Sequence, residues 1–180
     1  MRALLSARAL VRTGVTALAA TALTVSLAGS ASAATGTRSV TEGGTTYTMT
    51  LNSPDVLSAS GQVITVTGSG YNTARGIYVA LCVTPAGAVG TNKPTPCLGG
   101  QDETGTTGAS HWVNNLFGGT VANSSKFTAG GSFSAQIFVK ADLGGGNVCG
   151  DTVECSVVTK ADHFAPNNRN SDVVVPVSFE

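Results

Sequence analysis

The chain has 180 residues, of which 10 are basic and 10 acidic, and only 11% of its residues are charged. A length of this kind suits one compact domain. Because neutralised phosphates supply most non-specific nucleic-acid affinity, a chain without a basic excess or a run of like charge is a poor candidate for direct nucleic-acid binding.

The first 33 residues have the features of a secretory signal peptide. Three arginines precede a mostly apolar run over residues 13–29, and Ala31-Ser32-Ala33 offers a small-residue cleavage site. A membrane anchor is the competing interpretation, but the run is short for a bilayer and is interrupted by threonines. We therefore expect cleavage after Ala33 and a secreted product that keeps no contact with the membrane. Its net charge would be −3, from seven basic and ten acidic side chains.

The strands are predicted from residues that alternate between apolar and polar. Residues 34–44 are rich in Thr, Gly and Ser, and we expect a loose leader there. A first strand is predicted over 45–51, where Tyr47, Met49 and Leu51 alternate with threonines. We group residues 34–54 as leader and first strand, and residues 55–180 as the main domain. The same pattern predicts further strands over residues 62–67, 77–83, 110–114, 132–140, 153–160 and 172–179.

About seven strands with turn residues between them, and no helical period, predict an all-β fold. We favour a seven-stranded, antiparallel, immunoglobulin-like β-sandwich, with a small barrel as the rival fold. The least regular part is the glycine-rich segment 98–131. Long connections inside compact domains usually carry function or are disordered, and we expect a functional loop here.

All four cysteines lie in the exported part, and an even count in an oxidising compartment implies two disulfides. Three pairings are open, and we favour the local one, Cys82–Cys97 and Cys149–Cys155. If Ile77, Val79 and Leu81 face the core, Cys82 lies on the opposite face, and its bridge folds a loop down over that face. No C-x-x-C pair occurs, so we expect no metal site.

Catalytic motifs are missing from the sequence. It contains no G-x-S-x-G elbow, no H-E-x-x-H and no phosphate-binding glycine motif. Asp162 and His163 are adjacent, but any secreted domain with many serines offers such a pair. We therefore expect a protein that is not an enzyme.

The order of these features resembles the neocarzinostatin family, which consists of secreted actinobacterial apoproteins with a seven-stranded immunoglobulin-like sandwich. The resemblance covers roughly residues 55–180: a strand that ends in a cysteine, a loop to a second cysteine, a late close cysteine pair and a terminal V-x-V-x-F strand. The residues that carry it are Gly61–Gly68, Val79-Ala80-Leu81-Cys82, Cys97, Cys149, Cys155-Ser156-Val157 and Val175-Pro176-Val177-Ser178-Phe179.

The resemblance implies a carrier of a hydrophobic small molecule. The best-known family members hold an enediyne chromophore non-covalently in a cleft, protect it and deliver it to DNA, which the chromophore cuts. In the family the first disulfide lines the cleft, so Cys82 and Cys97 are the positions carried over. No other cofactor is expected, and the product is expected to be a monomer.

Residues that fall on strand faces opposite the predicted core would form the floor of such a cleft. An aromatic and small-residue floor with a few hydroxyls suits a mostly apolar ligand, although this face could instead pack on a loop. Trp112 either contacts the ligand or caps the core of its short strand, and we favour the second. The predicted cleft residues are Tyr78, Ala80, Cys82, Cys97, Trp112, Gln136, Phe138, Ser156 and Val158.

The alternative function is an exported interaction module that uses the same sandwich for contact with a protein or with haem. A haem or metal site would need His111 and His163 to come together. No ligand spacing supports that pair, so we expect His163 to be an exposed loop residue.

Overall fold

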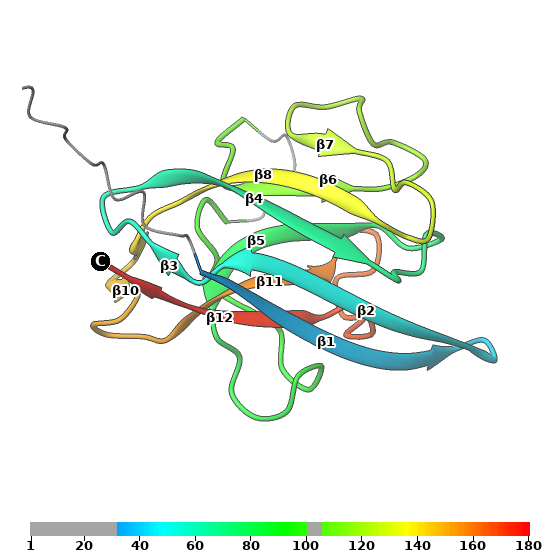
Figure 1. The fold of residues 1–180 in the computed structure, drawn as a ribbon, viewed down its shortest axis with the longest axis horizontal. Coiled ribbons are helices and arrows are strands. Elements are labelled where there is room, and N and C mark those ends of the chain that lie inside the picture. Colours follow the sequence, from blue (N-terminus) through cyan, green and yellow to red (C-terminus); the bar gives the residue numbers. More distant parts are fainter. Residues whose placement is uncertain (1–31, 101–105) are drawn as a thin grey trace, which may run out of the picture.

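The computed structural model describes residues 32–100 and 106–180, and it shows two β-sheets that face each other. Most of the predicted signal peptide, residues 1–31, lies outside the described residues. Within the described part of the chain, no helix is long and apolar enough to cross a membrane. The two-sheet arrangement confirms the predicted all-β sandwich and not the barrel (Figure 1).

The smaller sheet has four strands in the order β1-β2-β4-β8. These are β1 (Ala33–Glu42), β2 (Thr45–Pro54), β4 (Gln62–Ser69) and β8 (Phe133–Val139), and neighbouring strands are antiparallel.

The larger sheet has six strands in the order β3-β12-β11-β5-β6-β7. They are β3 (Val56–Leu57), β12 (Val173–Phe179), β11 (Cys155–Ala161), β5 (Ile77–Val83), β6 (Ser110–Val113) and β7 (Ser124–Ser125). A two-stranded ribbon pairs β9 (Asp142–Gly144) with β10 (Asn147–Val148). The structure thus contains all seven predicted strands and adds β1 and four short ones.

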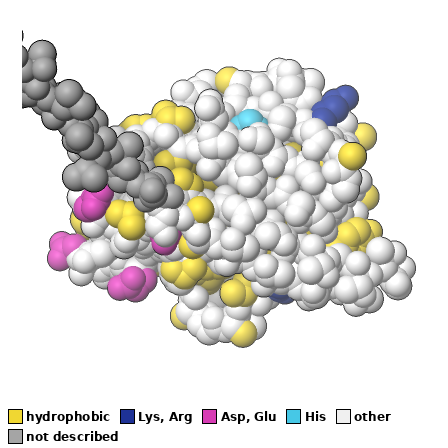
Figure 2. All heavy atoms as spheres, viewed as in Figure 1, with side chains coloured by type: hydrophobic (Ala, Val, Ile, Leu, Met, Phe, Trp, Pro, Cys, Tyr) yellow, Lys and Arg dark blue, Asp and Glu magenta, His cyan; other side chains and the backbone are white. Residues whose placement is uncertain are grey.

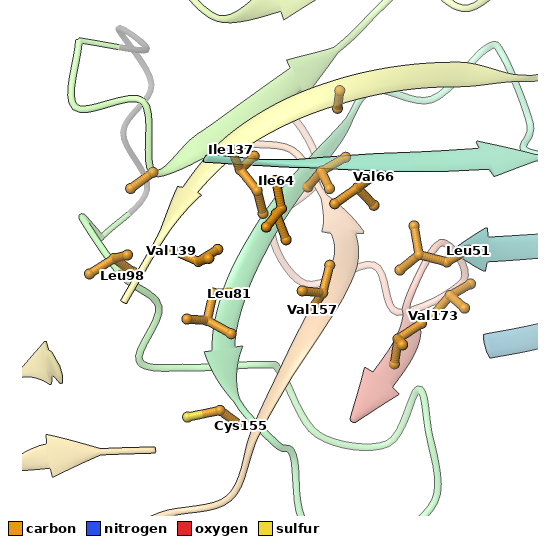
Figure 3. Close-up of a cluster of buried hydrophobic side chains, with 14 of the residues drawn as sticks. Leu51, Ile64, Val66, Leu81, Leu98, Ile137, Val139, Cys155, Val157 and Val173 are labelled. Carbon is orange, nitrogen blue, oxygen red and sulfur yellow. The ribbon is translucent and has the colours of Figure 1, made fainter. Parts of the chain in front are cut away.

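The core fills the space between the two sheets. Figure 3 shows side chains from both sheets pointing toward one another, with Ile64 and Ile137 on one side and Leu81 and Val157 on the other. All four are buried, as the alternation along their strands predicts. The inner face of β5 therefore carries Ile77, Val79 and Leu81, and its outer face carries Tyr78, Ala80 and Cys82.

The prediction of a loose leader over residues 34–44 was wrong. Residues 33–42 form β1, which pairs with β2 along its whole length and is half-buried at every second residue. Gly43 and Gly44 both have positive φ, as a two-residue hairpin turn of type I′ requires. Gly36 lies so close to β12 that a Cβ atom there would be 2.4 Å from the carbonyl oxygen of Val174.

Both predicted disulfides are confirmed. Cys82–Cys97 closes a loop of sequence separation 15, and Cys149–Cys155 closes a short one of separation 6. Cys97 forms an isolated bridge to Cys82, which brings the loop 84–97 onto the outer face of the larger sheet. That loop hangs below β12 in Figure 1.

Candidate ligand-binding site

Three segments meet at one end of the larger sheet. Strands β6 and β11 both run antiparallel to β5, so β6 and β11 end at the same edge, where β5 begins. The segments that meet there are residues 74–76, which precede β5, residues 114–117, which follow β6, and residues 162–165, which follow β11. Side chains far apart in the sequence thereby become neighbours.

An aromatic cluster of Trp112, Phe117, His163 and Phe164 lies at this edge. The rings of Trp112 and Phe117 are stacked at 6.1 Å, and Phe164 lies 5.7 Å from Phe117 and 4.3 Å from His163. Trp112 is buried, whereas Phe117 is 44% and Phe164 61% exposed. Leu116, next to them, is 78% exposed. The cluster therefore presents an apolar surface to solvent on a buried indole base.

A buried carboxylate fixes that base. Oδ2 of Asp162 accepts hydrogen bonds from Nε1 of Trp112 at 3.0 Å and from Nδ2 of Asn114 at 3.1 Å. Its Oδ1 accepts the backbone N–H of Phe164 at 3.1 Å. Gly76 leaves the necessary space, because a Cβ atom there would lie 1.7 Å from Oδ2. A buried acceptor with three donors holds the ring positions rigidly.

The partner of His163 lies on the outer face of β5. The hydroxyl of Tyr78 and Nδ1 of His163 are 2.6 Å apart, and the His163 ring lies 5.1 Å from that of Trp112. His163 is half-buried, so the prediction of an exposed loop histidine was wrong. Trp112 is buried against these rings on the outer face and does not cap the core between the sheets.

A cavity of about 180 Å³ adjoins the aromatic cluster. Arg75, Asn114 and Asn168 give it a polar side, and Leu116 and Phe164 give it an apolar side. A neighbouring hollow of about 260 Å³ shares residues 74–76 and Leu116 with it. The site thus combines exposed rings with a few polar groups, which is the composition of small-molecule sites.

An acidic residue on β1 holds Arg75 at the rim of the cavity. Nη2 of Arg75 lies 3.1 Å from Oε1 of Glu42, which also accepts a hydrogen bond from Asn170. The hydrogen bond from Asn170 is the largest cause of a lowered pKa of Glu42, followed by the one from Asn72 and, against burial, by the charge of Arg75. Glu42 therefore stays ionised and keeps the Arg75 guanidinium in place.

Most of the predicted cleft floor is sealed. Ala80, Cys82 and Val158 are fully buried and pack with Cys97 beneath the disulfide-closed loop. Ser156 is also fully buried, and its hydroxyl lies 2.7 Å from that of Thr84. These four strand residues share the outer face with Tyr78 as predicted, but the loop covers them.

Gln136 and Phe138 do not belong to this floor. Both lie on β8, which is part of the smaller sheet, so the prediction that they share a cleft floor with Tyr78 and Ala80 was wrong. Phe138 packs near Gly61, and Gln136 is exposed on the outside of the smaller sheet. Alternation assigned the correct face of each strand but carried no information on which sheet the strand joins.

His111 lies apart from His163. It pairs with Val79 on the inner face of the larger sheet, where Nδ1 is 3.1 Å from Oδ1 of Asn123 and Nε2 is 2.9 Å from the Ser125 hydroxyl. Burial lowers its pKa, against hydrogen bonds that raise it. Within residues 32–100 and 106–180, no group of three metal-binding side chains comes together.

Sequence reasoning missed the residues that complete the site. Phe117 follows a short strand in the glycine-rich segment, and Asp162 was weighed only as a partner for a serine protease triad. Apolar residues directly follow both β6 and β11, and the sheet topology brings these two strand ends together. The positions of these residues could therefore have identified the site, but the topology was not known from the sequence.

Comparison with known proteins gives one structural match. No family model and no curated protein sequence matches the chain. A search of solved structures finds macromomycin, with 19% sequence identity and a TM-score of 0.41 over 82% of this chain and 100% of that chain.

Proposed function

We propose that this chain is a secreted, non-enzymatic binding protein that carries or sequesters an apolar small molecule. The observation that carries the proposal is the aromatic cluster, in which exposed Phe117 and Phe164 rest on a buried Trp112 beside a cavity. The resemblance of the sequence to neocarzinostatin-type apoproteins adds the expectation of a chromophore-like ligand. Any DNA damage would come from the chromophore and not from the protein.

The ligand would lie against the rings of Phe117 and Phe164, with its polar groups toward Asn114 and Arg75. Offset stacking on aromatic rings contributes about 0.5–1.5 kcal/mol for each ring pair beyond area burial. Because Asp162 holds Trp112 from below, the surface is organised before the ligand arrives, which reduces the entropy lost on binding. In this proposal the ligand would lie at the end of the larger sheet where β5 begins and not beneath the Cys82–Cys97 loop.

One observation favours the second candidate, an interaction module for a protein partner. Leu116 projects from the same edge and is 78% exposed. A protruding apolar side chain next to exposed rings is also typical of protein-contact surfaces.

The test uses Trp112, the one tryptophan of the chain, as a fluorescent reporter. We would titrate the mature protein with the neutral dye Nile red and follow both Trp112 quenching and dye emission. The double variant Phe117→Ala/Phe164→Ala should raise Kd about tenfold, since it removes two ring contacts.

The control is Val63→Ala, which removes apolar surface on the smaller sheet that is 64% exposed and should leave Kd unchanged. An absence of dye binding, together with an absence of any extractable small molecule from protein purified out of the native culture supernatant, would overturn the carrier proposal and favour protein contact.

A further inference from the structure

A second cavity lies on the outer face of the larger sheet, on the other side of Tyr78 from the aromatic cluster. Tyr78 pairs with Trp112 on one side and with Lys160 on the other, so these three side chains form a row across β6, β5 and β11. The cavity has a volume of about 150 Å³ and is lined by Lys93, Thr95, Pro96, Cys97, Gly100 and Lys160. It sits at the edge of the disulfide-closed loop.

We propose that this cavity binds a small oxyanion, such as a sulfate, phosphate or carboxylate group, through the ammonium group of Lys160.

The first argument is that the Lys160 ammonium is buried without an adequate acceptor. Lys160 is only 5% exposed, and among the described residues its Nζ donates one hydrogen bond, to Sγ of Cys97 at 3.1 Å. An ammonium group has three donors, and a bridged sulfur is a weak acceptor. Buried cations are normally paired with a carboxylate or another strong acceptor, and within residues 32–100 and 106–180 Lys160 has no such hydrogen-bond partner.

The second argument is the balance of charge around Lys160. Lys93 faces it from the loop after β5, and Arg169 and Asp172 come from the segment before β12. Nη1 of Arg169 lies 3.0 Å from Oδ2 of Asp172, and Nη1 of Arg38 donates to the Asp172 carbonyl oxygen at 2.9 Å. Three cations, Lys160, Arg169 and Arg38, thus act on the Asp172 carboxylate, which is already held by Arg169. Lys93 adds a further positive charge beside Lys160.

The third argument is how readily Lys160 would respond to an anion. Burial, with smaller contributions from Lys93 and Arg169, lowers the pKa of Lys160 to about 8, whereas Asp172 opposes this shift. An oxyanion in the cavity would supply the missing charge and raise that pKa. By linkage, the anion should bind well while Lys160 is protonated and should be released as the pH rises through about 8.

The cavity is separate from the aromatic cluster, so this inference does not depend on the proposed function. Its lining includes the hydroxyl-bearing Thr95 and the exposed Lys93. A volume of about 150 Å³ matches an inorganic oxyanion or the acid group of a larger molecule and not a fused-ring dye. A neutral dye such as Nile red therefore tests the aromatic cluster, whereas an oxyanion tests the cavity at Lys160.

The experiment is an NMR titration of the Lys160 ε-carbon in the mature protein with sodium sulfate, phosphate or benzoate at constant ionic strength. We expect a saturable shift and an anion affinity that falls at least tenfold between about pH 6.5 and about pH 9.5. A preference for sulfate and phosphate would assign an inorganic or phosphate-bearing ligand, and a preference for benzoate would assign an organic acid.

Lys160→Met removes the ammonium group and keeps an unbranched apolar side chain that is one atom shorter. It should weaken binding at least tenfold, as followed by isothermal titration calorimetry. Lys93→Met, at an exposed position where folding is not at risk, should weaken it about threefold through lost attraction at the mouth. The matched control is Lys126→Met, an exposed lysine on another segment, which should bind as the wild type does. Shifts that never saturate, or equal losses in the Lys93→Met and Lys126→Met variants, would overturn the site.

Discussion

One half of the outer face of the larger sheet is covered by a loop, whereas the other half carries side chains that are exposed to solvent. Under the Cys82–Cys97 loop, Ala80, Cys82 and Val158 are completely buried. At the other edge, Phe117 and Phe164 stand in solvent on top of a buried Trp112. Both halves belong to one surface of the same three strands, β5, β6 and β11. The difference lies in what covers them: a loop fixed by a covalent bond on one side, and two short turns on the other.

The comparison teaches that a sheet face opposite the core does not have to form an open cleft. In the sequence, the predicted disulfide on that face was the strongest indication of a ligand site. In the structure the same bridge brings a loop down that fills the space. The accessible apolar surface lies where the segments that follow β6 and β11 carry the exposed rings of Phe117 and Phe164. On the face of the molecule that Figure 2 shows, charged side chains are few.

Removal of the Cys82–Cys97 disulfide, which holds the covering loop, should have the largest effect on the unfolding free energy. The double variant Cys82→Ala/Cys97→Ala releases a loop of sequence separation 15 and leaves Ala80 and Val158 without their lid. We expect a loss of roughly 3–5 kcal/mol in the unfolding free energy, measured by guanidinium denaturation. The matched variant Cys149→Ala/Cys155→Ala opens a loop of separation 6 and should cost about 2 kcal/mol. Equal losses in both variants would contradict the role of the loop as a cover.

The end of the larger sheet where β12 begins should show an unusual dependence on pH. Burial raises the pKa of Asp172 from 3.8 to about 6, against Arg169 and Arg38. A carboxyl group with a raised pKa binds more protons in the folded than in the unfolded state between these values. Its contribution therefore makes the unfolding free energy fall as the pH rises from about 4 to about 6, by about 3 kcal/mol.

Asp172→Asn should lack this component, so the difference between the wild type and the variant isolates it from other carboxyl groups such as Glu42, whose lowered pKa acts in the opposite direction. The measurement is denaturant unfolding of both proteins over a series of pH values. Parallel profiles would show that Asp172 titrates normally.

In the open half, the carboxylate beneath the rings should matter more than the rings do. Asp162→Ala leaves the N–H groups of Trp112 and Asn114 buried without their acceptor, which should cost about 2 kcal/mol in unfolding free energy. The Trp112 emission spectrum should shift at the same time. Asp151→Ala, at an exposed position, is the control and should change neither quantity. An unshifted spectrum in Asp162→Ala would mean that another group holds the indole.

The smallest effect on stability is expected for the rings themselves. Phe117→Ala and Phe164→Ala should each change the unfolding free energy by less than about 0.5 kcal/mol, because both side chains are substantially exposed. Val158→Ala in the covered half should cost about 2 kcal/mol although it removes a smaller side chain. Thermal unfolding of the three variants compares them directly. A large loss for either phenylalanine would show that the ring surface is structural and not free for a ligand.

Much of the fold could be predicted because strand alternation and disulfides are local signals. The strand containing Ile77 and Leu81, its two faces and both disulfide pairs follow from neighbouring residues. Strand β1 was missed because its half-buried positions do not form an apolar series: Gly36, Arg38 and Glu42 stand where other strands have Val or Ile. Its Gly43-Gly44 turn was the signal that would have identified the hairpin.

The site was less predictable because it depends on which strands are neighbours. Tyr78 and Trp112 were both named as candidate cleft residues, but their direct pairing between β5 and β6 was not predicted. Phe138 was misplaced because alternation does not distinguish the two sheets. Asp162 and Phe117 could not be joined to Trp112 until the shared direction of β6 and β11 was known.

The close approach of β1 to β12 has a consequence for how the molecule behaves among copies of itself. Beyond its short pairing with β3, one side of β12 would present a row of free backbone groups, a template on which other chains can add strands. Gly36 lets β1 lie directly on this side, Arg38 occupies two carbonyl oxygens at its start, and Pro176 interrupts it. A single glycine thus allows this flank of β12 to be shielded, and we expect the shielding to oppose edge-to-edge aggregation at high concentration.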